Sequence, residues 1–136
     1  MDPSFAVAHY RLGELYEEEK MYDKALSEFK QIIKLSDRNP LGPAALARVY
    51  ALAGKRDESQ KYLEQLLQMS KQRYVSPGLI ALVYVALGDK DKTFAWLEEL
   101  DKAHDLNAVR LKTDPRYDSL RSDSRFNDLV RRIGIP

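Results

Sequence analysis

A chain of 136 residues is long enough for one domain or for a short array of repeats. Its 44% hydrophobic and 32% charged residues are typical of a folded soluble protein. The absence of cysteine excludes disulfides and thiolate metal sites, and the net charge of +1 gives no indication of nucleic-acid or membrane binding. We expect a cytoplasmic protein, because no signal peptide is visible and the longest apolar run, Leu79 to Leu87, is too short to cross a membrane.

The hydrophobic pattern predicts six helices, which lie in chain order near residues 3–19, 22–36, 42–53, 56–71, 77–87 and 90–103. Asn39-Pro40 and Ser76-Pro77 indicate helix starts, since a capping side chain precedes a proline at both places. Gly54 and Gly88 stand where a helix ends with a left-handed residue. Lys20 stands at the corresponding turn of the first helix pair, so we expect modest backbone strain there.

Residues of similar size recur every 34 positions along the predicted helices. Tyr16, Tyr50 and Tyr84 are separated by 34 residues each. Five further columns align in the same register without a gap, namely Leu12/Leu46/Ile80, Gly13/Ala47/Ala81, Ala25/Ser59/Thr93, Phe29/Leu63/Leu97 and Ile32/Leu66/Leu100. Small residues suit the close approach of two helices within a hairpin. One hairpin cannot bury its apolar face alone, so we expect neighbouring hairpins to stack.

The first copy contains the residues of a known repeat pattern. Leu12-Gly13, Tyr16, Ala25 and Phe29 follow the spacing L-G-x2-Y and then A-x3-F, and His9 stands where that pattern has Trp. These residues resemble the tetratricopeptide repeat family, and the resemblance extends over about residues 6–103. It implies an all-α fold, an α–α superhelix of three helical hairpins plus a short C-terminal helical cap. Within residues 1–103 the three repeats are expected near 6–39, 40–73 and 74–103.

The repeat register fails at His104, and residues 104–136 are expected to form C-terminal capping helices. The two helices of this tail are expected to start at Asp114-Pro115 and at Ser122 or Asp123, to bury Tyr117, Leu120, Phe126, Leu129, Val130 and Ile133, and to end at Gly134. A stack of repeats needs a terminal cap with a polar outer face, and this tail is suited to that role.

Two stretches, Tyr74 to Glu98 and Leu111 to Gly134, are similar to the ending of certain bacterial tetratricopeptide repeat proteins. In that group the repeats commonly follow a regulatory or catalytic module. The resemblance therefore implies a bacterial protein of which this chain is the C-terminal part, behind a larger regulatory portion.

Residues that could carry catalysis or bind a metal have structural interpretations. His9 and His104 are the only histidines and lie almost three repeats apart, so they cannot share a metal or one catalytic triad. The aspartates of the tail are explained as helix caps and as ion pairs with neighbouring arginines. Motifs for phosphate binding, serine hydrolysis and zinc proteolysis are absent from the sequence. We therefore predict no enzyme activity, no cofactor and no metal.

The first helix of each hairpin is expected to line a concave groove. The predicted partner-binding residues are Tyr10, Glu14 and Glu17, then Leu41, Arg48 and Leu52, and finally Leu79, Leu82 and Val85. The first end of this groove is acidic and the far end is apolar, which favours a peptide or protein with an apolar anchor and a basic end. Tyr10, Glu14 and Ala45 stand where chaperone-binding members of the family have Lys and Asn, which disfavours that class of partner.

We therefore predict a protein–protein interaction module. The alternative is a structural scaffold that self-associates into a homo-oligomer. In that alternative Leu79, Leu82 and Val85 are covered by the tail or by another copy of the chain.

Overall fold

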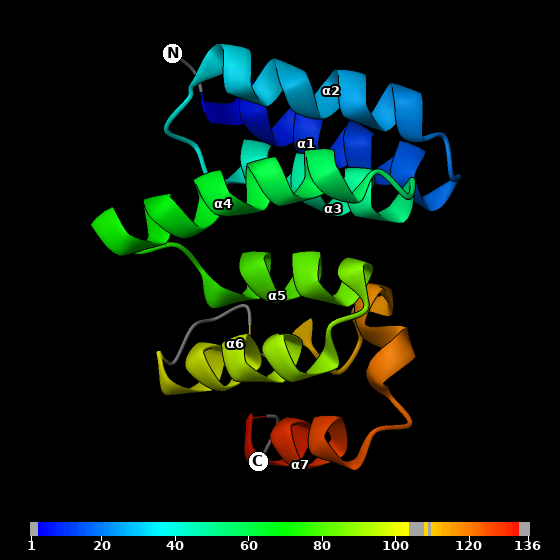
Figure 1. Ribbon diagram of the computed structural model, residues 1–136, viewed down its shortest axis with the longest axis vertical. Coiled ribbons are helices and arrows are strands. Elements are labelled where there is room, and N and C mark those ends of the chain that lie inside the picture. Colours follow the sequence, from blue (N-terminus) through cyan, green and yellow to red (C-terminus); the bar gives the residue numbers. More distant parts are fainter. Residues whose placement is uncertain (1–2, 104–107, 109, 134–136) are drawn as a thin grey trace. The chain divides into compact units, whose positions relative to one another are not determined.

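The computed structural model describes residues 3–103, 108 and 110–133, and the regular structure of these residues is helical (Figure 1). Its helices are α1 Pro3–Glu18, α2 Tyr22–Leu35, α3 Leu41–Leu52, α4 Arg56–Gln72, α5 Pro77–Leu87, α6 Lys90–Lys102, the 3-10 helix η2 Pro115–Leu120 and α7 Ser124–Ile133. The predicted all-α fold is confirmed. Every end of the six predicted repeat helices lies within one residue of the observed end.

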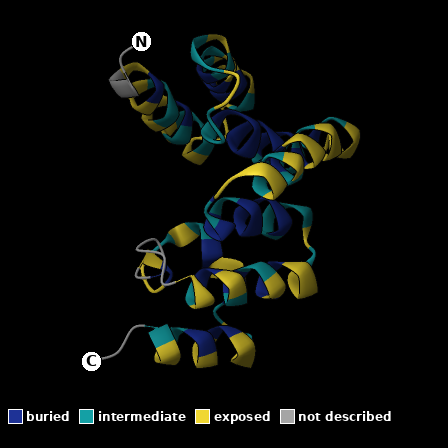
Figure 2. Cartoon of the chain, turned by 90° about the vertical axis from the view of Figure 1, so that its left-hand side faces the viewer, coloured by how far each residue is buried: buried dark blue, intermediate teal, exposed yellow. Residues whose placement is uncertain are grey.

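Contacts divide the chain into two compact units, Met1–Val75 and Ser76–Pro136. Unit 1 contains two helical hairpins, α1–α2 and α3–α4, and unit 2 contains the hairpin α5–α6 together with η2 and α7. Figure 2 shows that α3 and α5 are mostly buried, whereas α4 and α7 each have an exposed side. The predicted boundaries of the repeats within residues 1–103 stay a prediction.

The turns within the hairpins follow the predicted backbone conformation. Gly54 and Gly88 have φ angles of 81° and 79°, in the region that glycine adopts without strain. Lys20 has a φ angle of 60° and is the one non-glycine residue with positive φ in the described part of the chain. The expected strain at the first turn is therefore present.

Side-chain caps begin the first helices of the second and third hairpins. The N–H of Leu41 donates to Asn39 Oδ1 over 3.0 Å, and the N–H of Gly78 donates to Ser76 Oγ over 3.3 Å. Each cap satisfies a backbone donor that has no partner within the helix. The predicted cap-plus-proline start is thus confirmed for α5, whose N-cap is Ser76, whereas the N-cap of α3 is Pro40 and Asn39 bonds the backbone one residue before the cap.

The core of unit 1 lies between α1, α2 and α3. Phe29 and Ile32 of α2 are buried there together with Leu46 and Val49 of α3. Gly13 allows α1 to approach α2 closely, because a Cβ atom at this position would lie 2.2 Å from the Phe29 ring. This contact explains why the first copy has glycine in the small-residue column.

In the second and third hairpins, the position equivalent to Ala25 holds a residue with a hydroxyl group, Ser59 or Thr93. Ser59 Oγ donates to the carbonyl oxygen of Ala47 over 2.7 Å, and Thr93 Oγ1 donates to the carbonyl oxygen of Asp89 over 2.7 Å. Both side chains are completely buried. Because each hydroxyl is hydrogen-bonded, Ser and Thr are accepted where the first copy has Ala25.

Gly13→Ala should lower the free energy of unfolding of unit 1 by about 1–3 kcal/mol, because the added methyl group overlaps the buried Phe29 ring. This loss outweighs the gain of about 1 kcal/mol that alanine gives in a helix. Gly78→Ala is the matched control, since its Cβ would meet no atom closer than 3.5 Å. Urea unfolding followed by circular dichroism measures both variants, and equal stability of Gly13→Ala and the parent would show that Phe29 can move aside.

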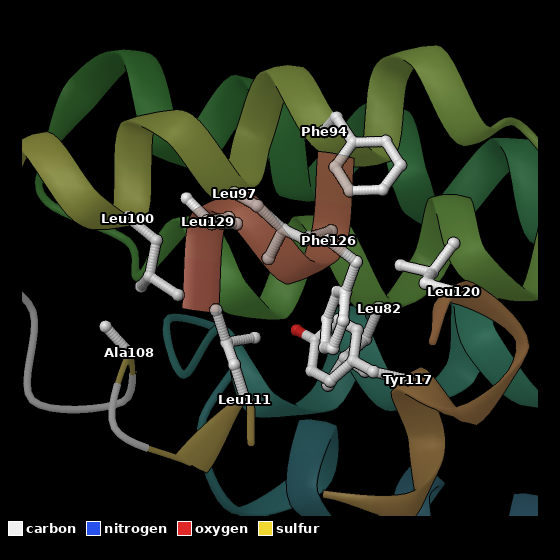
Figure 3. Close-up of a cluster of buried hydrophobic side chains, with 11 residues drawn as sticks. Leu82, Phe94, Leu97, Leu100, Ala108, Leu111, Tyr117, Leu120, Phe126 and Leu129 are labelled. Atoms are coloured by element: carbon white, nitrogen blue, oxygen red, sulfur yellow. The ribbon is translucent and has the colours of Figure 1, made fainter. Parts of the chain in front are cut away.

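The core of unit 2 joins the third hairpin to the tail (Figure 3). Its buried members are Ala81, Leu82, Phe94, Leu97, Leu100, Ala108, Leu111, Tyr117, Leu120, Phe126 and Leu129. The rings of Tyr117 and Phe126 are stacked with their centroids 6.2 Å apart. Burial of the predicted apolar residues of the tail is confirmed, with Val130 and Ile133 partly buried against the same cluster.

Charged side chains join α7 to α6 at the surface of unit 2. Arg125 Nη1 lies 2.9 Å from Asp91 Oδ1, and Arg132 Nη2 lies 2.6 Å from Glu98 Oε1. Arg125 also pairs with Asp123 and lowers the pKa of that carboxyl group through a hydrogen bond. These exposed pairs are screened by water and salt, so the buried apolar cluster is the main attachment of the tail.

The predicted starts of the tail helices are confirmed. Asp114 and Asp123 each accept a hydrogen bond of 2.9 Å from the backbone N–H two residues later. Gly134, where the last helix was predicted to end, and His104, where the repeat register fails, lie outside the described residues.

Candidate functional site

Two of the predicted groove residues form an ion pair that connects the first helices of unit 1. Arg48 Nε on α3 donates to Glu17 Oε2 on α1 over 3.1 Å. The side chains are only 11% and 9% exposed, respectively. Glu17 is therefore largely neutralised by Arg48 and contributes little net negative charge to a partner site. The sequence spacing of 31 residues gave no indication of this contact.

The other predicted residues of unit 1 lie on the same two helices and are partly buried. Tyr10 packs against the core through the ring of Phe29, with the ring centroids 5.9 Å apart. Leu41 also packs partly against this core, and Glu14 and Leu52 are half-buried. We call these four residues and the Glu17–Arg48 pair the inner face of unit 1. Their role in binding stays a prediction.

The predicted residues of unit 2 lie in a different environment. Leu82 is 6% exposed and belongs to the core that contains the tail, and Val85 is partly buried against that core (Figure 3). The Tyr117 hydroxyl of η2 lies 3.5 Å from the carbonyl oxygen of Gly78 and donates to it. Leu79 is half-buried and is not part of the cluster. The tail therefore covers the predicted binding side of α5 at Leu82.

Two aligned positions of the repeat differ in their exposure. Leu12 aligns with Leu46, yet Leu12 is 40% exposed while Leu46 is 0% exposed. Leu46 is buried in the core of unit 1 because α2 lies against α3. Leu12 and Leu15 are exposed on α1, and the alignment did not indicate this difference.

The remaining polar features of the structure have structural roles. His9 Nδ1 lies 3.0 Å from Glu28 Oε1 and connects α1 to α2. Burial, assisted by the Asp89 carboxylate, raises the pKa of Tyr84 above its ordinary value. A surface hollow of about 490 Å³ lies along α4, and none of the predicted partner-binding residues lines it. Its lining residues are Lys61, Glu64, Gln65, Leu67, Gln68 and Lys71.

The described residues contain no group of three His, Asp or Glu side chains arranged to hold a metal ion. Among the same residues, no helix combines the length and the apolar character that a membrane span requires.

Comparison with known proteins supports the resemblance seen in the sequence. Residues 16–75 match a family model described as tetratricopeptide repeat. This segment begins near the end of α1 and includes α2, α3 and α4. A search of curated proteins and a search of solved structures returned no match.

Proposed function

Residues 16–75 belong to the tetratricopeptide repeat family, and from this premise we propose that the chain binds a protein or peptide partner on the inner face of unit 1. Repeats of this family generally mediate protein–protein interaction and are not catalytic. The chain is accordingly proposed as an interaction module rather than an enzyme.

The observation that carries this proposal is the position of η2 against α5 within unit 2. Leu82 of α5 aligns with Glu14 and Arg48 at intervals of 34 residues, so the three residues occupy equivalent places on their helices. At Leu82 this place is covered by a short helical segment that contributes Tyr117 and Leu120. Unit 2 thus supplies an internal example of a helical segment bound at this position of the repeat.

The side chains of the inner face of unit 1 favour a partner of different chemistry from η2. Leu41 and Leu52 offer apolar contacts, and Glu14 favours a basic group. A short peptide with one apolar anchor and a nearby Lys or Arg fits this combination. Burial of one such anchor contributes about 1.5–3 kcal/mol, and a few anchors less the cost of ordering the peptide correspond to roughly micromolar affinity.

A displayed library of random peptides, selected against the immobilised chain, tests the proposal. We expect the selected peptides to share an apolar residue close to Lys or Arg. Glu14→Lys should weaken their binding at least about tenfold, because the attraction between Glu14 and the Lys or Arg of the peptide becomes a repulsion between two positive charges. Glu18→Lys, an exposed residue of the same helix, is the matched control and should leave binding unchanged.

Failure to select any peptide would contradict the proposal. Equal binding by the parent and Glu14→Lys would show that peptides bind the chain at another surface. Circular dichroism of both charge-reversed variants would establish that each is folded before binding is compared.

The burial of Leu82 favours the scaffold function for unit 2, where the tail occupies the equivalent position. The similarity of the ending to bacterial multidomain proteins supports a second part of the proposal, a place at the C-terminal end of a larger regulatory protein. An immunoblot of the source cells tests this part. A single band at the mass of these 136 residues would contradict it.

A further inference from the structure

The tail segment that lies against α5 forms hydrogen bonds within itself. The N–H of Tyr117 donates to the carbonyl oxygen of Asp114 over 3.2 Å. The N–H of Arg121 donates in the same way to the carbonyl oxygen of Asp118 over 3.2 Å. The Asp114 side chain accepts from the N–H of Arg116 over 2.9 Å and so caps the turn. The segment thus satisfies these backbone groups within one capped helical turn.

Arg121 holds this turn in shape through its side chain. Its Nη1 donates to the carbonyl oxygen of Lys112 over 2.9 Å, and its Nη2 donates to the carbonyl oxygen of Asp114 over 2.8 Å. Its Nε donates to Asp118 Oδ1 over 2.7 Å. All three acceptors belong to the tail, so these bonds shape the turn without involving α5. A ligand that is ordered before it binds loses less conformational freedom on binding.

Two apolar side chains of the turn make its buried contact with unit 2. Tyr117 and Leu120 are 3% and 1% exposed, and they belong to the cluster that contains Leu82 of α5 (Figure 3). They are three residues apart in a 3-10 helix, and this spacing places them on the same side of the turn. Two apolar anchors on one side of a capped turn therefore hold this segment at α5.

Unit 1 has residues at the equivalent places on its own helix α3. Ala44 and Arg48 lie 34 residues before Gly78 and Leu82, respectively. Gly78 is the residue whose carbonyl oxygen accepts from the Tyr117 hydroxyl. Ala44 is also small and is 5% exposed. A helical turn can therefore approach α3 closely beside Arg48, as η2 approaches α5.

The helices α1 and α3 offer both kinds of contact that such a turn needs. Leu52 stands four residues after Arg48, so the two lie along one side of α3. Tyr10 and Glu14 are likewise four residues apart on α1. The bond of 3.1 Å between Arg48 and Glu17 joins the two helices. Leu52 and Tyr10 suit apolar anchors, and Glu14 suits a basic side chain.

A helical turn also suits unit 1 better than an extended peptide does. Within α1 and α3 the backbone N–H and C=O groups bond along each helix, so these helices offer no strand edge for an extended peptide. The residues that define the inner face of unit 1 include no Asn or Gln side chain that could bond a peptide backbone instead. A helical turn bonds its own backbone groups internally and needs no such partner.

We propose that the partner of the inner face of unit 1 binds as one capped helical turn, with two apolar residues three positions apart and a Lys or Arg beside them. The two apolar residues contact Leu52 and Tyr10, and the basic residue lies next to Glu14. This inference rests on the proposed function, because it specifies the partner of the same site.

The peptides selected from the displayed library test the inference through the spacing of their apolar residues. We expect two apolar residues three positions apart, preceded by a capping residue such as Asp, as in the tail. A spacing of two, which is typical of an extended strand, or any other recurrent spacing would overturn the inference and leave the proposed function standing. A library that yields no peptide contradicts the proposed function itself, so the two failures are distinguishable.

Two synthetic peptides of identical composition give a second test. The first has the sequence of residues 113–124 with Asp118→Lys, which keeps the cap and both anchors and adds a positive charge. In the second peptide the residues at positions 119 and 120 are also exchanged, so that the two anchors stand two positions apart. Fluorescence anisotropy with the full chain should show at least about tenfold weaker binding for the second peptide.

The charge-reversed chains show where the first peptide binds. Glu14→Lys should weaken its binding at least about tenfold, whereas the control Glu18→Lys should leave it unchanged. Equal binding of the two peptides would overturn the inference, because the spacing of the anchors would then have no effect. Failure of the first peptide to bind would overturn it too. Binding that Glu14→Lys does not change would place the peptide on another surface, such as the side of α5 that the tail covers, and would also overturn it.

Discussion

Leu82→Glu should lower the free energy of unfolding of unit 2 by about 4 kcal/mol or more. Leu82 is 6% exposed beneath the tail, and its removal from the core costs about 1.5–3 kcal/mol. The substitution also places a carboxylate among Leu111, Tyr117 and Leu120 or forces the tail to separate from α5. Urea unfolding followed by the fluorescence of Trp96 measures the loss of stability, since Trp96 is the only tryptophan of the chain and packs against the same core.

Leu79→Glu is the matched control for this experiment. Leu79 stands on the same helix, is half-buried and is not part of the cluster. Its substitution should change the stability of unit 2 by less than about 1 kcal/mol. If Leu82→Glu unfolds at the same urea concentration as the parent chain, then the tail does not cover α5, and the binding side of the third hairpin is open.

Arg48→Met should lower the free energy of unfolding of unit 1 by about 3 kcal/mol. The substitution keeps most of the side-chain volume but leaves the carboxylate of Glu17 without its partner at 3.1 Å. A largely buried charge without its counter-charge is strongly unfavourable. The double variant Glu17→Gln, Arg48→Met should recover part of the loss, because it removes both charges. Urea unfolding followed by circular dichroism measures the three chains, with Trp96 fluorescence reporting unit 2 separately.

An exposed ion pair of unit 1 provides the comparison. Lys61 Nζ lies 3.7 Å from Glu58 Oε2, and the side chains are 70% and 47% exposed. Lys61→Met should therefore change stability by no more than about 0.5 kcal/mol. If Arg48→Met has an equally small effect, then water already screens the Glu17–Arg48 pair, and the pair does not fix α1 against α3.

Features of the fold that are encoded locally could be predicted from the sequence. Helix ends followed from capping residues such as Asn39 and Ser76 and from glycines such as Gly88, because these act on the adjacent backbone. The hairpins followed from the 34-residue recurrence, since each copy repeats the same sizes of side chain. Gly13 is an example, because the ring of Phe29 lies where a larger side chain would have to be, and this explains why a small residue stands at this position of the repeat.

Features that depend on the surroundings of a residue could not be predicted in this way. The pattern treats Leu12 and Leu46 alike, but Leu46 is buried in the core of unit 1 and Leu12 is 40% exposed. The pairing of Glu17 with Arg48 depends on the approach of α1 and α3, which no spacing encodes. The sequence left two alternatives for Leu82, which could line an open groove or be covered by the tail. It predicted that Tyr117 and Leu120 are buried but did not specify which residues they cover.

Under the proposed function, the tail that covers Leu82 is a tethered competitor for a peptide, because it belongs to the same chain. A segment joined by a short connection is present at an effective concentration of about millimolar order, whatever the concentration of the protein. A free peptide of micromolar affinity must overcome that local excess before it can reach α5 at Leu82. Within unit 2, the apolar side chain of Leu82 is thus already covered by a segment that cannot diffuse away from it.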